Sequence, residues 1–123
     1  MKALEIKIRS REEANREFIE AWHAAAAGRK VTPSKGVYFT SWKAVRRIIT
    51  DKRMTLLHLI REKSPKSIYE LAKLAHRDFK NVHADVKLLK WYGLIEFDPP
   101  SRKGRATRGL RSPYGAINIH AAI

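Results

Sequence analysis

The segment from Phe79 to Lys87 holds side chains suited to recognising the bases of duplex DNA. The amide of Asn81 can pair with N6 and N7 of adenine, and Lys80 can reach O6 and N7 of guanine. His83 can donate to a base or a phosphate, whereas Phe79 either contacts a thymine methyl group or packs within the fold. The predicted base-facing set is Phe79, Lys80, Asn81, His83, Ala84 and Lys87. The alternative is a solvated helix face without a ligand.

A helix has to present these side chains together. Val82, Val86 and Leu89 recur at spacings of four and three residues, which marks one buried helix face. That helix is expected to begin after Asp78, a residue type favoured at the N-cap, and to end near Tyr92. With the three aliphatic side chains inward, the base-facing set points outward.

A shorter helix is predicted to precede this one. Ser67 and Glu70 form a capping box, in which a hydroxyl and a carboxylate each satisfy a backbone N–H group at a helix start. Apolar spacing then predicts about two helical turns, followed by a tight turn at residues 76–78. This order is a helix-turn-helix arrangement, whose second helix enters the major groove. The segments "LIEF" and "YGAINIHA", separated by a basic loop, predict the two strands of a wing.

The rest of the chain supplies an N-terminal extension and two connecting helices. "LEIKI" alternates like a half-buried strand, and a capping box at Ser10 and Glu13 starts a helix over about residues 11–27. "VYF" and helical stretches over residues 42–63 then lead into the motif. The predicted fold class is mainly α with a small β wing (α+β), a winged helix-turn-helix with an N-terminal strand-helix extension. The predicted domains are residues 1–36 for the extension and residues 37–123 for the winged helix-turn-helix.

The charge of the chain favours a polyanionic partner. Its 123 residues contain 26 Lys and Arg against 12 Asp and Glu, a net charge of +14, which points to nucleic acid. A membrane surface, or a proteome that is basic throughout, is the alternative. Residues 67–97 carry five basic and four acidic residues, so most of the excess lies on either side of them. This division suits base readout by donors and acceptors, with cations beside it for phosphates.

Two groups of basic residues are therefore predicted to hold the DNA backbone. Wing arginines can enter the minor groove or pair with phosphates. The wing group is Arg102, Lys103, Arg105, Arg108 and Arg111. The second group is Arg46, Arg47, Lys52, Arg53, Lys66 and Arg77. The alternative for the wing is a loop that only solubilises the protein.

Asp85 interrupts this pattern, because a carboxylate facing phosphates would be repelled. It either accepts a hydrogen bond from a cytosine amino group or pairs with a basic residue such as Arg77 inside the fold. The internal pairing is the favoured interpretation.

The stretch "SIYELAKLAHRDFKNVHADVKLLKWYGLIEF" resembles the winged helix-turn-helix of MarR-like and ArsR-like transcriptional regulators. It is more similar to a group of small DNA-binding proteins of bacteria and archaea that carry the motif Arg-Asp-x-x-Asn-Val-His-x-Asp-Val, here residues 77–86. The resemblance covers about residues 38–97 well and the wing loosely. It implies a dimeric transcriptional regulator of double-stranded DNA, with repression as its expected action. Some members of the group are regarded as antitoxins, which implies a role in neutralising a small toxin and regulating its operon as the alternative.

The N-terminal extension is the candidate for contact with another protein. A lone strand needs a partner strand, and the apolar stripe of its helix needs a surface to cover it. The residues assigned to dimerisation or partner binding are Leu4, Ile6, Ile8, Phe18, Ile19 and Trp22. A homodimer would match two-fold related DNA half-sites. The alternatives are that the extension folds back on its own domain, or that it holds a small protein toxin.

Other classes of function find little support in the residues. The chain has no cysteine, and its five histidines show no ligand spacing backed by carboxylates, so we expect no metal and no cofactor. No nucleophile–base arrangement suggests an enzyme. No apolar run approaches the roughly 20 residues that cross a bilayer, and the N-terminus has charges where a signal peptide is apolar. We therefore expect a cytoplasmic protein without a membrane partner. A non-specific architectural or RNA-binding protein is the less favoured alternative.

Overall fold

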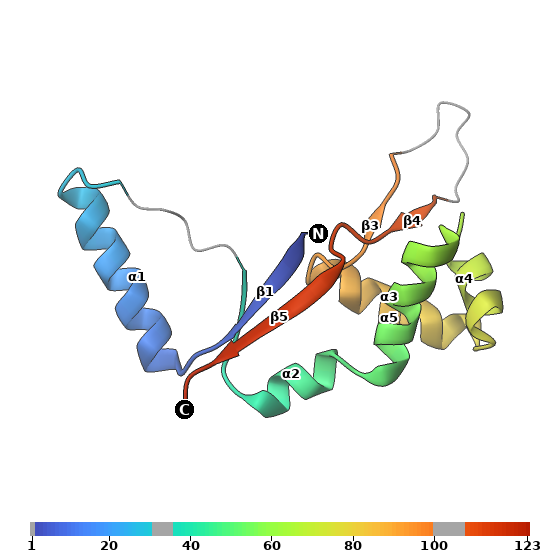
Figure 1. Cartoon of the computed structure of the whole chain (residues 1–123), viewed down its shortest axis with the longest axis horizontal. Coiled ribbons are helices and arrows are strands. Elements are labelled where there is room, and N and C mark those ends of the chain that lie inside the picture. The colour runs from blue at the N-terminus through green and yellow to red at the C-terminus, as the bar shows by residue number, and fades with distance from the viewer. Residues whose placement is uncertain (1, 31–35, 100–107) are drawn as a thin grey trace.

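The computed structural model describes residues 2–30, 36–99 and 108–123. Figure 1 shows one helix at one end of the molecule, a helical cluster with the wing strands at the other, and a sheet between them. The elements within the described residues follow in the order β1 (Ala3–Ile8), α1 (Arg11–Ala26), β2 (Val37–Phe39), α2 (Trp42–Ile48), α3 (Asp51–Lys63), α4 (Ile68–Ala75), α5 (Phe79–Trp91), β3 (Glu96–Phe97), β4 (Leu110–Arg111) and β5 (Ala116–Ala121).

Hydroxyl side chains set the starts of four helices. The side-chain oxygens of Ser10, Ser41, Thr50 and Ser67 each accept a hydrogen bond from the backbone N–H three residues later. These bonds satisfy donors that have no partner within the first turn of a helix. Asp78 occupies the N-cap position of α5, as predicted, but its carboxylate makes no capping hydrogen bond.

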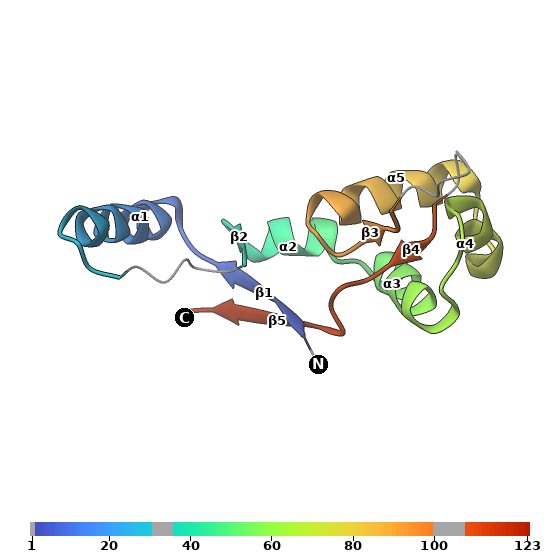
Figure 2. The same ribbon diagram turned by 90° about the horizontal axis from the view of Figure 1, so that it is seen from above.

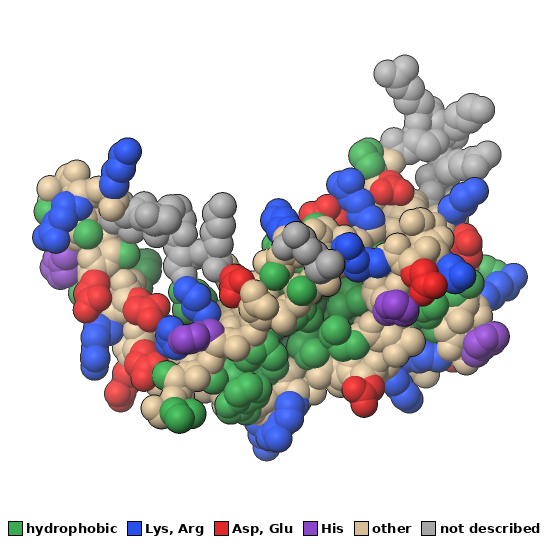
Figure 3. Space-filling view, in the orientation of Figure 1, with side chains coloured by type: hydrophobic (Ala, Val, Ile, Leu, Met, Phe, Trp, Pro, Cys, Tyr) green, Lys and Arg blue, Asp and Glu red, His purple; other side chains and the backbone are tan. Residues whose placement is uncertain are grey.

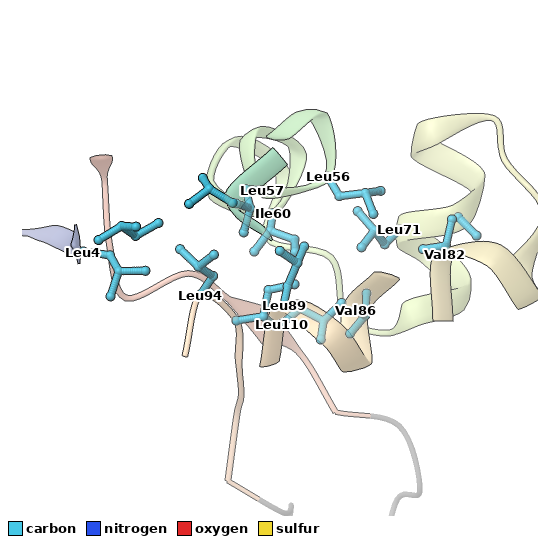
Figure 4. Close-up of a cluster of buried hydrophobic side chains, with 14 of the residues drawn as sticks. Leu4, Leu56, Leu57, Ile60, Leu71, Val82, Val86, Leu89, Leu94 and Leu110 are labelled. Atoms are coloured by element: carbon cyan, nitrogen blue, oxygen red, sulfur yellow. The ribbon is translucent and has the colours of Figure 1, made fainter. Parts of the chain in front are cut away.

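The main core lies where α3, α4 and α5 meet (Figure 4). Leu56 and Leu71 face the buried side of α5, where Val82, Val86 and Leu89 are 0% exposed. Burying a side chain of this size contributes about 1.5–3 kcal/mol relative to leaving it in water. The inward face predicted from the spacing of residues 82, 86 and 89 is confirmed.

The turn between α4 and α5 is short because His76 adopts a left-handed backbone conformation with φ of 53°. The backbone N–H of the next residue, Arg77, then donates to the carbonyl of Ala72 at 3.1 Å. Helix α5 begins two residues after Arg77, so the predicted turn over residues 76–78 is confirmed. Helices α4 and α5 form a helix-turn-helix, and the strands β3 and β4 that follow make it winged.

The wing differs from the prediction in its second strand. Strand β3 pairs antiparallel with β4, with Phe97 opposite Leu110, and the N–H of Leu110 also donates to the carbonyl of Pro65 at 3.0 Å. The expectation that "YGAINIHA" forms the second wing strand is wrong, because β5 pairs in parallel with β1. Strand β4 has only two residues, too few to show an alternating pattern in sequence.

Strand β1 is the centre of a three-stranded parallel sheet with the order β2-β1-β5. Leu4 lies opposite Ile117 and Ile6 opposite Ile119, and Leu4 and Ile6 are 5% and 1% exposed. The boundary predicted after residue 36 is therefore corrected, since the first strand belongs to the same sheet as the last. Backbone groups of a lone strand need partners, and β5 supplies them. Helix α1 contains no buried residue and lies apart from the sheet in Figure 2.

Candidate nucleic-acid interface

The outer face of α5 gathers the predicted base-facing residues on one accessible surface. Phe79, Lys80, Asn81, Ala84 and Lys87 are exposed, and His83 is partly exposed. Their position follows from packing, since the opposite side of α5 is closed by the core. The exposed side chains offer amide, imidazole and ammonium donors and carry no carboxylate.

Asp85 is the acidic residue of α5, and two arginines hold it. Its Oδ1 lies 3.1 Å from Nε of Arg53 in α3, and its Oδ2 lies 2.9 Å from an Nη of Arg77 in the turn. The carboxylate is 13% exposed, and the two arginine side chains are 20% and 22% exposed. Arg53 also donates to the carbonyls of Arg47 and Ile48. The predicted internal pairing of Asp85 with Arg77 is confirmed, and Arg53 is a second partner that the sequence did not indicate.

Two of the predicted backbone contacts have an internal role. Arg53 and Arg77 are largely buried and hold Asp85, so they tie α3, the turn and α5 together instead of standing free in solvent. One Nη atom of Arg77 is buried without a hydrogen-bond partner among the described residues. The other predicted contacts in this group are exposed, namely Arg46, Arg47, Lys52 and Lys66.

The predicted wing residues fall into two groups. Arg102, Lys103 and Arg105 lie outside the described residues. Arg111 lies in β4 and not in the loop, with an Nη 3.2 Å from Oε2 of Glu96, and both side chains are well exposed. Arg108 lies next to β4 and is partly buried, which places it at the base of the wing.

An aromatic cluster adjoins the start of α5. The ring of Phe79 lies 6.3 Å from that of Tyr69 in α4 and 5.6 Å from that of His83, measured between centroids. Nζ of Lys73 lies 4.7 Å from the centroid of Tyr69. Tyr69 was not among the predicted site residues. Its outward position on α4 is visible in the sequence, but its contact with Phe79 across the turn is not.

The residues predicted to bind a partner fall into two groups, one on β1 and one on α1. Leu4 and Ile6 are buried in the chain's own core, so these two assignments are corrected, whereas Ile8 is partly buried against that core. The three side chains on α1 are open to solvent, with exposed fractions of 69% for Phe18, 53% for Ile19 and 67% for Trp22. The accessible part of the predicted partner surface is therefore the apolar face of α1.

Neither a metal centre nor a membrane segment is found in the described parts of the chain. No group of three or more His, Asp or Glu side chains there is placed to hold a metal ion. No helix there combines the length and apolar character needed to cross a membrane.

Comparison with models of known protein families assigns the chain to one of them. The model of the HVO_A0114 family matches residues 48–119, which include α3, α4, α5, the wing strands and part of β5. The chain belongs to the HVO_A0114 family. The match covers more than half of the 123 residues, and it begins at Ile48, the last residue of α2, so β1, α1 and β2 lie outside the family match.

Two solved structures are similar to this member of the HVO_A0114 family. One is the homodimeric winged helix-turn-helix DNA-binding domain of a Mycobacterium bovis protein described as a possible ArsR-family transcriptional regulator. It shares 14% identity with a TM-score of 0.45, over 85% of this chain and 71% of that one. The other is MarR, with 17% identity, a TM-score of 0.47 and coverage of 83% and 64%. The chain thus spans less than two thirds of the MarR chain. No curated protein matches the chain in sequence.

Proposed function

We propose that the chain is a sequence-specific, double-stranded DNA-binding transcriptional regulator that acts as a dimeric repressor. The observation that carries the proposal is the outer face of α5. It presents Lys80, Asn81 and Lys87 to solvent, while the one carboxylate of this helix, Asp85, is turned inward and neutralised. A helix that enters the major groove reads base edges through donors such as these, and Asp78, at the N-cap before the helix, is the exposed carboxylate that remains beside them.

Specific binding should appear in a comparison of two duplexes. We expect the chain to bind the DNA upstream of its own coding sequence at least about 10³-fold more tightly than a scrambled duplex of the same composition. Both affinities should fall with salt, because Lys and Arg displace counterions from phosphates. Fluorescence anisotropy between roughly 50 and 200 mM salt measures both quantities. Equal affinity for the two duplexes at every salt concentration would contradict the proposal and favour a non-specific nucleic-acid-binding protein.

The dimer proposed here is held by α1. Phe18 and Trp22 are one helical turn apart, with Ile19 beside them, and together they form the exposed apolar stripe of α1. The outer face of the sheet is a less suitable partner for the stripe, because it carries charged and amide side chains: Asn118 donates to Glu5 there at 2.9 Å, and Nζ of Lys7 lies 5.7 Å from the ring centroid of Tyr38. A second copy of the same helix supplies an apolar partner for the stripe.

Charge also favours contact between two copies through α1. Residues 11–26 contain four acidic and two basic residues, so α1 is the one helix among the five described that carries a net negative charge, and its red carboxylates are seen along the helix in Figure 3. Two copies of a chain with net charge +14 repel each other. Contact through α1 brings together the least cationic helices and keeps the basic surfaces apart. A small toxin, the partner implied by the resemblance, would have to cover the same face.

Replacing Trp22 should separate the two copies. Trp22→Lys places a charge in the proposed helix contact, and we expect the mass measured by sedimentation equilibrium to fall from dimer to monomer. Trp91→Lys is the matched control, because Trp91 is 83% exposed at the end of α5 and should leave the mass unchanged. A wild-type chain that is monomeric throughout the concentration range, or a Trp22→Lys chain that stays dimeric, would show that α1 is not the contact.

A further inference from the structure

Strand β5 forms one edge of the three-stranded sheet, and its outer side is open. The strand order is β2-β1-β5, so the backbone groups of β5 that point away from β1 have no partner strand among the described elements. None of these elements lies on that side of β5 in Figure 2. Alternate N–H and C=O groups of an edge strand face outward in this way and can pair with a further strand.

The edge of β5 lacks the features that normally keep edge strands from pairing. Protected edges are short or bulged, or they carry Lys or Pro. Strand β5 is as long as β1, with six residues, and its register with β1 is continuous from Ala3 to Ile8. The segment Ala116–Ala121 contains no Lys, Arg or Pro. The opposite edge strand, β2, has only three residues, so β5 is the edge better suited to pairing.

The core-facing side of β5 is only partly covered. Ile119 lies opposite Ile6 of β1, so the two side chains are on the same face of the sheet. Ile6 is 1% exposed, whereas Ile119 is 40% exposed. The core therefore ends at β5 with apolar surface that one more strand would remove from water.

A hollow of about 360 Å³ adjoins this edge, between α3 and the start of β5. Its apolar lining includes Met54 and Leu57 from α3, Leu94, and Ile117 from β5. Met54 is 41% exposed, so part of this lining is open to solvent. When a strand is added to a sheet edge, its backbone supplies hydrogen bonds and its alternate side chains enter pockets of this kind.

The charged residues that line the hollow already have partners. An Nη of Arg61 donates to the carbonyls of Ser112 and Tyr114, at 3.2 and 3.0 Å, which holds the segment before β5 against α3. Nε2 of His58 lies 2.9 Å from Oε2 of Glu62. The hollow is therefore held in place by α3 and suits an apolar side chain.

Charge identifies the partner as a second copy of the chain. Residues 113–123 contain no Lys, Arg, Asp or Glu, although the chain carries a net charge of +14. An acidic partner strand would find no cation on β5 to pair with. Two cationic copies repel each other least where both present an uncharged segment, and β5 supplies that segment in both.

We propose that the open edge of β5 pairs antiparallel with β5 of a second copy, which joins two three-stranded sheets into one across a two-fold axis. An axis at Ile119 sets this residue opposite itself and Ile117 opposite Ala121, so the core-facing side chains of both copies share one face. The same register brings Ile123, which is fully exposed, opposite Gly115 at the hollow. Ile123 of each copy fills the hollow of the other.

This contact is separate from the contact through α1. A chain that uses both assembles beyond the dimer. A strand edge of six residues is a small interface, so this step should need a higher protein concentration than the dimer does. In Figure 2, α5 lies on the side of the molecule away from the open edge of β5, so the pairing leaves the candidate DNA-binding helix uncovered.

Disulfide cross-linking tests the contact and its register, because the chain contains no cysteine. Opposite residues of an antiparallel pair have Cα atoms about 4.5–5.5 Å apart, within reach of a disulfide. Ile119→Cys, incubated with oxidised glutathione, should therefore form a covalent dimer. Asn118→Cys is the matched control. The axis at Ile119 places residue 118 opposite His120 and more than about 7 Å from its own copy, so cross-linking should be at least about tenfold slower.

The filling of the hollow has its own variant. Ile123 is fully exposed, so Ile123→Asp should leave folding intact while it places a charge against the apolar lining. Added to Ile119→Cys, it should slow cross-linking at least about tenfold. Ile19→Asp, which changes an exposed isoleucine on α1, is the control and should leave the rate unchanged.

Each other outcome contradicts a defined part of the proposal. If Ile119→Cys cross-links no faster than Asn118→Cys, the edges of β5 do not pair around Ile119. Faster cross-linking of Asn118→Cys would place the axis at residue 118 instead. An unchanged rate with Ile123→Asp would show that Ile123 does not fill the hollow. The cross-link should also form in the Trp22→Lys chain, so failure of the α1 dimer and failure of the β5 contact are distinguished.

Discussion

Asp85→Ala is expected to destabilise the fold by about 3 kcal/mol, the largest loss we anticipate from a single residue outside the aliphatic core. The substitution leaves Arg53 and Arg77 facing each other with no carboxylate between them, and both are only about one fifth exposed. One Nη of Arg77 already lacks a hydrogen-bond partner among the described residues, so removing the Asp85 carboxylate would leave the guanidinium of Arg77 with fewer acceptors still. Unpaired buried charge is strongly unfavourable because the protein interior solvates it poorly.

Urea unfolding followed by circular dichroism measures this effect, and a fall in Tm of roughly 10 °C should accompany it. Glu96→Ala is the matched control, because the pair of Glu96 with Arg111 is 48% and 61% exposed and exposed pairs contribute about 0–1 kcal/mol. If Asp85→Ala unfolds at the same urea concentration as Glu96→Ala, the ion pairs of Asp85 with Arg53 and Arg77 do not stabilise the fold.

Asn81→Ala is expected to remove most of the preference for one base in the DNA site while leaving folding intact. A bidentate pair between an amide and adenine discriminates by about 1–3 kcal/mol, so affinity for the preferred duplex should fall by roughly 5- to 150-fold. Affinity for a scrambled duplex should stay unchanged, because it depends on phosphate contacts. Asn81 is exposed, and exposed substitutions of this kind change stability by at most about 0.5 kcal/mol.

A double-mutant cycle identifies the base. Replacing each adenine of the site in turn by 7-deazaadenine removes the N7 acceptor. At one position this replacement should lower the DNA affinity of the wild type but not that of Asn81→Ala. Asn118→Ala, an exposed amide on β5, is the control and should behave like the wild type. If the replacement lowers the affinity of the wild type and of Asn81→Ala equally at every adenine position, Asn81 does not contact adenine N7.

Local patterns were enough to predict the helix-turn-helix because each signal involves residues a few positions apart. The hydroxyl caps at Ser10 and Ser67 satisfy N–H groups three residues away, and the buried aliphatic residues of α5 recur every three or four positions. These interactions depend on the identity of near neighbours, which the sequence states directly. The position of the exposed face of α5 follows from them.

Contacts between distant segments were not predictable in this way. Strand β5 pairs with β1 across almost the whole chain, and its alternation suits either a wing or a parallel sheet. Arg53 and Asp85 are 32 residues apart, and nothing local shows which of many arginines meets the carboxylate.

By itself, the sequence determined the helix-turn-helix, the turn after α4, the buried face of α5 and the basic character that favours a polyanionic partner. Only the tertiary structure decided that β1 completes the sheet, that Asp85 is held by two arginines, and that Tyr69 contacts Phe79 across the turn. The reason is that the start of a helix and its buried face depend on residues three or four positions apart, which can be read directly from the sequence. Pairing between strands and between charges depends on which distant groups the packed core brings within a few ångströms.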